Sequence, residues 1–147
     1  MRIIIAEAGT EYKTAEARTI RSPEAAANEA REIAGSDTEC MVVLCLNAKN
    51  GMLASEIIST GIVDASLVHP REVFRSAIMR NSSAIILVHN HPSGDTTPSA
   101  EDIRITRQVV DAGKIIGIGV LDHMIVGMRD GKLESTSIRE MGLVDFS

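Results

Sequence analysis

The sequence predicts one α/β domain built in three layers, with a mixed β-sheet flanked by helices. Two observations predict this class: apolar runs of strand length alternate with segments of helical pattern, and no repeat, low-complexity tract or linker divides the chain. A chain of 147 residues can bury well over half of its unfolded surface in a single core. We therefore expect one domain over residues 22–147, preceded by an N-terminal strand extension over residues 1–21.

The first elements expected are two short strands and an alanine-rich helix. Residues 2–6 and 12–20 have the composition of strands. Ser22-Pro23 then opens a helix, because serine can accept hydrogen bonds from the free amide groups of a first turn and proline suits the first helical position. The pattern predicts that this helix continues to Gly35.

The middle of the chain predicts a β-hairpin followed by a second helix. Two apolar runs surround Asn50-Gly51, a pair that favours the positive φ of a tight turn. A hairpin is therefore expected from Cys40 to about Ser59. Over residues 70–80 the apolar side chains recur at helical spacing, which predicts a helix with one buried stripe.

The second half begins with "SAIILVHNH", an apolar run typical of a strand buried on both faces. We expect the following elements after it, in order: a helix over residues 99–112 that ends at Gly113, a strand to Leu121, a turn at Asp122 and His123, a strand to about Gly127, a hairpin turn at Asp130 and Gly131, and a short closing helix.

Composition and charge narrow the classes of function. The net charge of −5 disfavours non-specific duplex binding, which depends on lysine and arginine contacts with phosphates. The chain has one tyrosine, two phenylalanines and no tryptophan, too few aromatic residues for a platform that stacks bases. No apolar run approaches the roughly 20 residues of a transmembrane helix, and the first residues lack the apolar core of a signal peptide. The expected location is the cytoplasm, with no membrane partner.

The two cysteines, Cys40 and Cys45, are expected to be buried free thiols. Their odd spacing places them on opposite faces of a strand, so they cannot share a metal ion or a disulfide. Redox chemistry is therefore not expected.

His89 and His91, at the end of the apolar run, are the main candidates for metal ligands. Side chains two positions apart in a strand point to the same face, so the two imidazoles can converge. The helix expected from Ser99 can bring Asp102 back to this end of the strand. Two histidines and a carboxylate can hold a catalytic zinc ion, which keeps a fourth position for water. The same ligands suit iron(II), and the spacing leaves that choice open.

Glu56, in the second strand of the hairpin, is the carboxylate we expect beside such a water. A glutamate on an edge strand is also commonly a solvent-facing charge. Ser99 and Asp102 match the capping box S-x-x-D, in which both residues satisfy helix amide groups and bind nothing else. Three polar neighbours of the motif are expected to be structural: His69, Asp95 and His123.

The segment "HNHPSGDTTPSAED" fits the JAMM motif, His-x-His, seven residues, Ser, two residues, Asp, through His89, His91, Ser99 and Asp102, with Glu56 as the upstream glutamate. The flanking "SLVHPREVFRSAIMRNSSAIILVHNHPSGD" and "GIGVLDHMIVG" resemble the bacterial RadC branch of the JAB/MPN metalloprotein superfamily. The resemblance covers roughly residues 22–143 and implies a JAB/MPN domain, which has a cytidine-deaminase-like architecture.

The resemblance implies that His89, His91 and Asp102 bind one zinc ion per chain, that Glu56 acts as general acid/base, and that Ser99 stabilises the tetrahedral intermediate. In the superfamily this constellation hydrolyses peptide and isopeptide bonds. The expected function is therefore that of a zinc-dependent metallopeptidase or isopeptidase acting on a peptide or protein substrate.

Two alternatives stay open. RadC-like proteins carry a DNA-repair label, which implies an accessory or nucleic-acid-binding module with a structural metal, although the acidic charge does not support nucleic acid as a partner. A catalytically idle scaffold would use the metal for stability alone. The sequence gives neither the substrate nor the oligomeric state.

Overall fold

The computed structural model describes residues 18–62 and 68–147. The strand expected over residues 2–6, and most of the N-terminal extension, lie outside the described residues. The elements are, in chain order, α1 (Pro23–Glu29), α2 (Arg31–Ala34), β1 (Glu39–Leu46), β2 (Met52–Ile62), α3 (Pro70–Met79), β3 (Ala84–Asn90), α4 (Ala100–Ile116), β4 (Gly119–Arg129), β5 (Lys132–Ser137) and α5 (Ile138–Met141).

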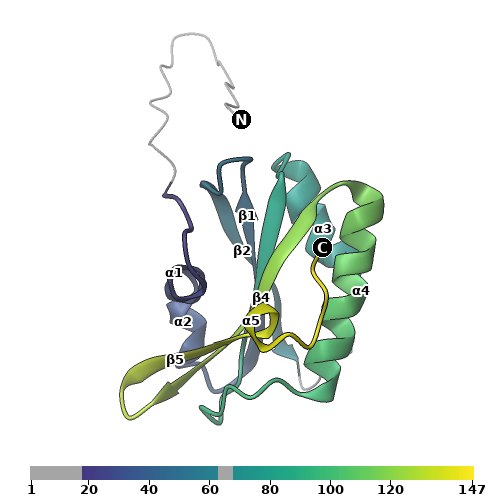
Figure 1. Ribbon diagram of the computed structural model, residues 1–147. Coiled ribbons are helices and arrows are strands. Elements are labelled where there is room, and N and C mark those ends of the chain that lie inside the picture. The colour runs from purple at the N-terminus through teal and green to yellow at the C-terminus, as the bar shows by residue number, and fades with distance from the viewer. Residues whose placement is uncertain (1–17, 63–67) are drawn as a thin grey trace, which may run out of the picture.

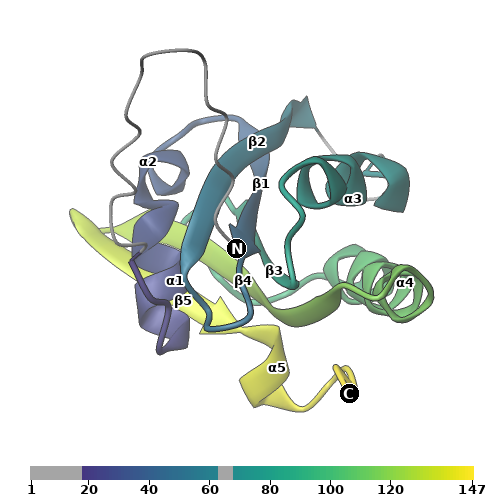
Figure 2. The same cartoon turned by 90° about the horizontal axis from the view of Figure 1, so that it is seen from above.

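The described strands form one mixed sheet in the order β2-β1-β3-β4-β5. Strands β3 and β4 run parallel, and the other neighbouring strands run antiparallel. Helices α1 and α2 cover one face of the sheet, and α3 and α4 cover the other (Figures 1 and 2). This is the predicted three-layer α/β architecture. Within the described ranges, every helix is too short or too polar to cross a lipid bilayer.

The central strands β1 and β3 separate two apolar cores. The α3/α4 core includes Met41, Val43, Cys45, Leu87, Ile105 and Ile125. The α1/α2 core includes Ala27, Cys40, Val42, Leu44, Val88 and Met124. Odd positions of β1 enter the first core and even positions enter the second, as the two-residue period of a strand requires. The two cysteines are free, buried and on opposite faces, as predicted.

The first helix begins as predicted but breaks early. The Ser22 hydroxyl accepts a hydrogen bond from the backbone N–H of Ala25 at 3.1 Å, and proline occupies the first turn. The expectation of one helix to Gly35 is wrong, because Ala30 has a non-helical backbone (φ −116°, ψ 22°) that ends α1 and begins α2. Its N–H bonds to the carbonyl of Ala27, and the run of alanines around it carries no breaker residue that would signal the change.

The predicted end of the long helix at Gly113 is also wrong. Helix α4 continues to Ile116 and ends at Gly117, whose φ of 86° is left-handed. Gly113 serves close packing instead, since a Cβ there would lie 2.5 Å from the carbonyl oxygen of Ile118 and 3.3 Å from the ring of Phe74. The glycine that ends the helix and the glycine that packs it are four residues apart.

Strand β4 runs without a break through Asp122 and His123, where we expected a turn. A bulge replaces that turn: the partner of Ile85 is Val120 and the partner of Ile86 is Asp122, so Leu121 is an extra residue. The polar side chains do not interrupt the strand because they find partners. The Asp122 carboxylate, for example, accepts hydrogen bonds from the N–H of His123 at 2.7 Å and the hydroxyl of Ser137 at 2.5 Å.

The two predicted hairpins and the closing helix are present, whereas most of the strand expected over residues 12–20 lies outside the described residues. The β1–β2 hairpin turns through Asn50, which has a φ of 60°. The β4–β5 hairpin turns through Asp130 and Gly131, both with positive φ as a tight primed turn requires. The closing helix is α5, capped by the hydroxyl of Ser137.

Candidate metal centre

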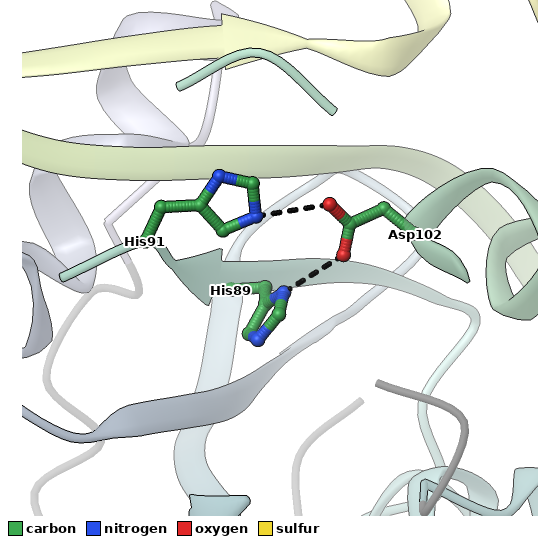
Figure 3. Close-up of side chains that lie close together, drawn as sticks. All are labelled: His89, His91 and Asp102. Carbon is green, nitrogen blue, oxygen red and sulfur yellow. Dashed lines mark hydrogen bonds and ion pairs between the residues drawn. The ribbon is translucent and has the colours of Figure 1, made fainter. Parts of the chain in front are cut away.

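Two imidazoles and a buried carboxylate meet at the end of β3 (Figure 3). Nδ1 of His89 lies 3.0 Å from Oδ1 of Asp102, and Nε2 of His91 lies 2.9 Å from Oδ2. The two rings are nearly perpendicular, at 86° with centroids 5.4 Å apart. The structure thus brings together the three residues that the spacing of the motif predicted to converge.

The loop after β3 is held tightly against β4. The backbone N–H of His91 bonds to the carbonyl of Val126 at 2.9 Å, which extends the β3–β4 pairing by one residue. Gly94 then turns the chain with a φ of 83°, and a Cβ there would lie 2.6 Å from the carbonyl oxygen of Met128. A Cβ on Gly127 would lie 2.9 Å from the Cα of Gly94. Glycines are needed at both positions because the two backbones touch, and this contact fixes the loop.

The first turn of α4 presents Asp102 through a complete capping box. Oγ of Ser99 accepts from the N–H of Asp102 at 3.0 Å, and Oδ2 of Asp102 accepts from the N–H of Ser99 at 2.8 Å. The Thr106 hydroxyl lies 2.6 Å from the Asp102 carbonyl. The capping interpretation and the ligand interpretation of Asp102 are therefore compatible, because a single carboxylate caps the helix and faces both histidines. Ser99 is exposed and can still donate its own hydroxyl hydrogen.

Asp102 is ionised in this setting. Burial raises the pKa of its carboxyl, but hydrogen bonds from His89, His91 and the N–H of Ser99 together hold the pKa below its ordinary value. The hydrogen bond that His91 donates to Asp102 raises the pKa of His91, against the desolvation that lowers it. In the metal-free protein a proton thus stabilises the contact between His91 and Asp102.

The tautomer of His91 suits a metal ligand. Its Nδ1 lies 2.9 Å from the carbonyl oxygen of Asp95, which can only accept a hydrogen, so Nδ1 carries one. Nε2 is then left to face the carboxylate, with a proton or with a cation in the proton's place. Metal-ligating histidines usually donate their second N–H to a carbonyl or carboxylate in this way.

The three side chains fit a small cation. Their donor atoms lie within 4.8 Å of one another. With bonds of about 2.1 Å, two ligands of tetrahedral zinc lie about 3.4 Å apart, so a slight widening of the two hydrogen bonds would admit an ion. Nε2 of His89 is buried without a hydrogen-bond partner among the described residues, so this second nitrogen of the ring is also available to a cation. Imidazole and carboxylate donors suit zinc or iron(II).

A second carboxylate close to His89 belongs to Glu39, a residue that the sequence reasoning missed. Oε2 of Glu39, the first residue of β1, lies 3.6 Å from Nε2 of His89, and the side chain is 26% exposed. The feature of the sequence that could have pointed to Glu39 is its place as the first residue of a buried strand. It could be used only with the knowledge that β1 pairs with β3 in the register Met41 opposite His89.

The structure does not bring Glu56 into the group of converging ligand atoms. The Ser76 hydroxyl on α3 donates a hydrogen bond to the Glu56 carboxylate, which lines an open cavity of about 570 Å³ between β2 and α3. In the sheet register Glu56 lies opposite Val43, whereas His89 lies opposite Met41. Strand β1 therefore lies between Glu56 and His89, and the two residues are offset by two positions along that strand.

The three polar neighbours of the motif, His69, Asp95 and His123, differ in burial. His69 is exposed at the start of α3, and the Asp95 carboxylate accepts from the N–H of Thr97 in the loop. His123 is fully buried, with its ring centroid 6.3 Å from that of His89 and its Nδ1 2.6 Å from Oγ1 of Thr106. Burial, together with the charge of His89, lowers the pKa of His123 to about 3. The imidazole that packs behind His89 is therefore neutral.

Comparison with known proteins places these features in a family context. The family model described as the RadC-like JAB domain matches residues 20–143. A UPF0758 protein of Caldanaerobacter subterraneus is 56% identical over 104 residues, covering 71% of this chain and 43% of that protein. A UPF0758 protein of Desulforamulus reducens is 54% identical over 108 residues, covering 74% and 46%. The chain thus spans about half the length of the curated relatives it matches.

Proposed function

Because the chain belongs to the RadC-like JAB domain family, we propose that it is a zinc-dependent hydrolase of peptide or isopeptide bonds. One observation carries the proposal: the ligand atoms of His89, His91 and Asp102 converge within 4.8 Å at the end of a buried strand. Two histidines and one carboxylate leave the fourth position of zinc for water, which is the arrangement of a catalytic site.

Zinc bound there would lower the pKa of a coordinated water to about 7 and polarise a carbonyl oxygen. The protein side chains supply the rest. Asp102 contributes a negative ligand, whose pKa is held down by hydrogen bonds from His89, His91 and the N–H of Ser99. His91 is oriented by its bond to the carbonyl of Asp95. Both ligands are thereby fixed before any substrate arrives, which lowers the cost of ordering them.

We assign the role of general acid/base to Glu39. Its carboxylate lies 3.6 Å from Nε2 of His89 without belonging to the three ligands, and its partial exposure would let it reach the water and the leaving group. It would take the proton of the attacking water and deliver it to the leaving amine. Ser99, exposed at the start of α4, would donate its hydroxyl hydrogen to the oxyanion of the substrate.

The two glutamates provide a matched test. Zinc-loaded wild type, Glu39→Gln and Glu56→Gln would be assayed against a panel of peptide and isopeptide substrates, with zinc content measured in each. We expect Glu39→Gln to keep its zinc and lose about 10²–10⁴-fold in turnover, the usual contribution of a general base, while Glu56→Gln retains activity. The reverse pattern would return the role to Glu56. A zinc-loaded wild type that cleaves nothing in the panel would reject the hydrolase.

The alternative of a nucleic-acid-binding module makes a different prediction. It requires salt-dependent binding of branched or single-stranded DNA, because phosphate contacts release counterions. The net charge of −5 disfavours such binding. A gel-shift experiment at low salt with the same preparations distinguishes the two proposals.

A further inference from the structure

Asn90 stands between the two histidines in sequence, and its side chain makes an unusual pair of contacts. It is fully buried. Its Oδ1 accepts a hydrogen bond from the backbone N–H of Cys40 at 2.5 Å, and its Nδ2 donates to the carbonyl of Thr38 at 2.9 Å. These two backbone groups belong to the peptide bonds on either side of Glu39. The amide of Asn90 thus holds the backbone of Glu39 from both sides.

The two hydrogen bonds of Asn90 continue the connection between β3 and β1 beyond the end of their regular pairing. The register between β1 and β3 stops at Met41 opposite His89, and the β1–β2 register shifts between Glu39 and Cys40. Regular pairing with β3 therefore does not fix the backbone at Glu39. A carboxamide offers one acceptor and one donor, as a strand residue does, so Asn90 supplies with its side chain the missing partner for the backbone.

We propose that Asn90 is a positioning residue that sets the distance between Glu39 and His89. The inference rests on the proposed role of Glu39 as general acid/base. Since successive residues in a strand point to opposite faces, "His-Asn-His" places two imidazoles in the metal centre and one amide behind it. A shift of the β3 end therefore moves the histidines and Glu39 together, and the 3.6 Å separation is preserved.

The test uses Asn90→Ala, the volume-conserving Asn90→Asp, and Asn47→Ala as the matched control. The Asn47 side chain likewise makes two hydrogen bonds to the backbone, but at the opposite end of β1: its Oδ1 accepts from the N–H groups of Lys49 and Gly51. With an active substrate, we expect both Asn90 variants to keep their zinc and to lose about ten- to a hundredfold in kcat with KM unchanged, as for a misplaced catalytic group. Asn47→Ala should keep the wild-type kcat.

A double-mutant cycle separates positioning from general damage to the fold. In the Glu39→Gln background, Asn90→Ala should cost nothing further, because the group it positions is already lost. An equal loss of kcat in both backgrounds would overturn the proposal. So would loss of the metal from Asn90→Ala together with loss from Asn90→Asp.

Two measurements without turnover keep this inference distinct from the proposed function. In the metal-free protein, amide hydrogen exchange at Cys40 should become faster in both Asn90 variants, with exchange at Gly51 unchanged. In the cobalt-substituted protein, Asn90→Ala should change the visible absorption spectrum as Glu39→Gln does. A hydrolase that proves inactive would leave both tests in force. Wild-type exchange at Cys40, or a wild-type cobalt spectrum in Asn90→Ala beside an altered one in Glu39→Gln, would overturn the positioning role.

Discussion

Nε2 of His91 lies 2.9 Å from Oδ2 of Asp102, and the other nitrogen of that ring faces a backbone carbonyl at 2.9 Å. In the first contact, the protonated Nε2 donates a hydrogen bond to the carboxylate. The second contact engages Nδ1, so Nε2 is the nitrogen that faces Asp102. A cation at this centre must displace that proton, and the consequences can be measured.

Metal binding should therefore strengthen as the pH rises. The hydrogen bond to Asp102 raises the pKa of His91 above 6.5, so below this raised pKa the proton competes with the metal. The apparent zinc affinity should fall by about tenfold per pH unit there and level off above it. Competition with a chromophoric chelator at several pH values measures this dependence. An affinity that stays constant through this range would show that the His91 proton is not displaced.

Zinc content should follow the three ligands. Plasma mass spectrometry of protein purified without added metal should find one zinc per chain in wild type and none in His91→Ala or Asp102→Asn, because two remaining ligands bind too weakly. His69→Ala, which changes an exposed histidine, is the control and should keep its zinc. Iron in the wild type would replace hydrolysis by redox chemistry. No metal after incubation with zinc would reduce the motif to a strand end and a helix cap.

Buried His123 should make the metal-free protein sensitive to acid. Its pKa is about 3 in the folded state and 6.5 in an ordinary setting, so between these values the unfolded chain binds a proton that the folded chain does not. The free energy of unfolding should then fall as the pH drops below about 6.5, by at most about 1.4 kcal/mol per pH unit. Urea unfolding of wild type and His123→Gln at several pH values should show a smaller fall in the variant. His69→Gln should keep the wild-type pH dependence.

Two glycines in β4 should respond differently to alanine. A Cβ on Gly127 would lie 2.9 Å from the Cα and 3.1 Å from the carbonyl oxygen of Gly94, so Gly127→Ala must displace the loop that carries His91. We expect a loss of about 1–3 kcal/mol in unfolding free energy and weaker zinc binding. A Cβ on Gly119 would meet no described atom within 4 Å, and Gly119→Ala should leave zinc binding unchanged. Equal effects of the two substitutions would contradict the close contact.

The part of the site that could be predicted from sequence is the part set by local geometry. The two-residue period of a strand places His89 and His91 on one face, and the capping box places Asp102 in the first turn of α4. Neither inference requires knowledge of distant contacts. Glu39 could not be found in this way, because its closeness to His89 depends on which strand pairs with β3 and in which register.

The errors in the fold have the same origin. Asp122 and His123 resemble a turn because polar residues interrupt an apolar run, but their partners Ser137 and Thr106 lie far away in the sequence. Gly113 resembles a helix end because glycine often ends helices. Its actual role is to leave room for the ring of Phe74, which only the tertiary fold brings close to it. The break at Ala30 has no sequence signal that we can identify.

The extra residue in β4 sets the phase of everything that follows it in that strand. Before the bulge, the even-numbered Ile118 and Val120 enter the α3/α4 core, and after it the odd-numbered Ile125 does so. If Leu121 were paired in a regular ladder instead of forming the bulge, either the preceding or the following half of β4 would present its side chains to the opposite face of the sheet, and in the second case His123 would leave Thr106. One unpaired residue thus decides which layer of the protein receives the imidazole behind the metal centre.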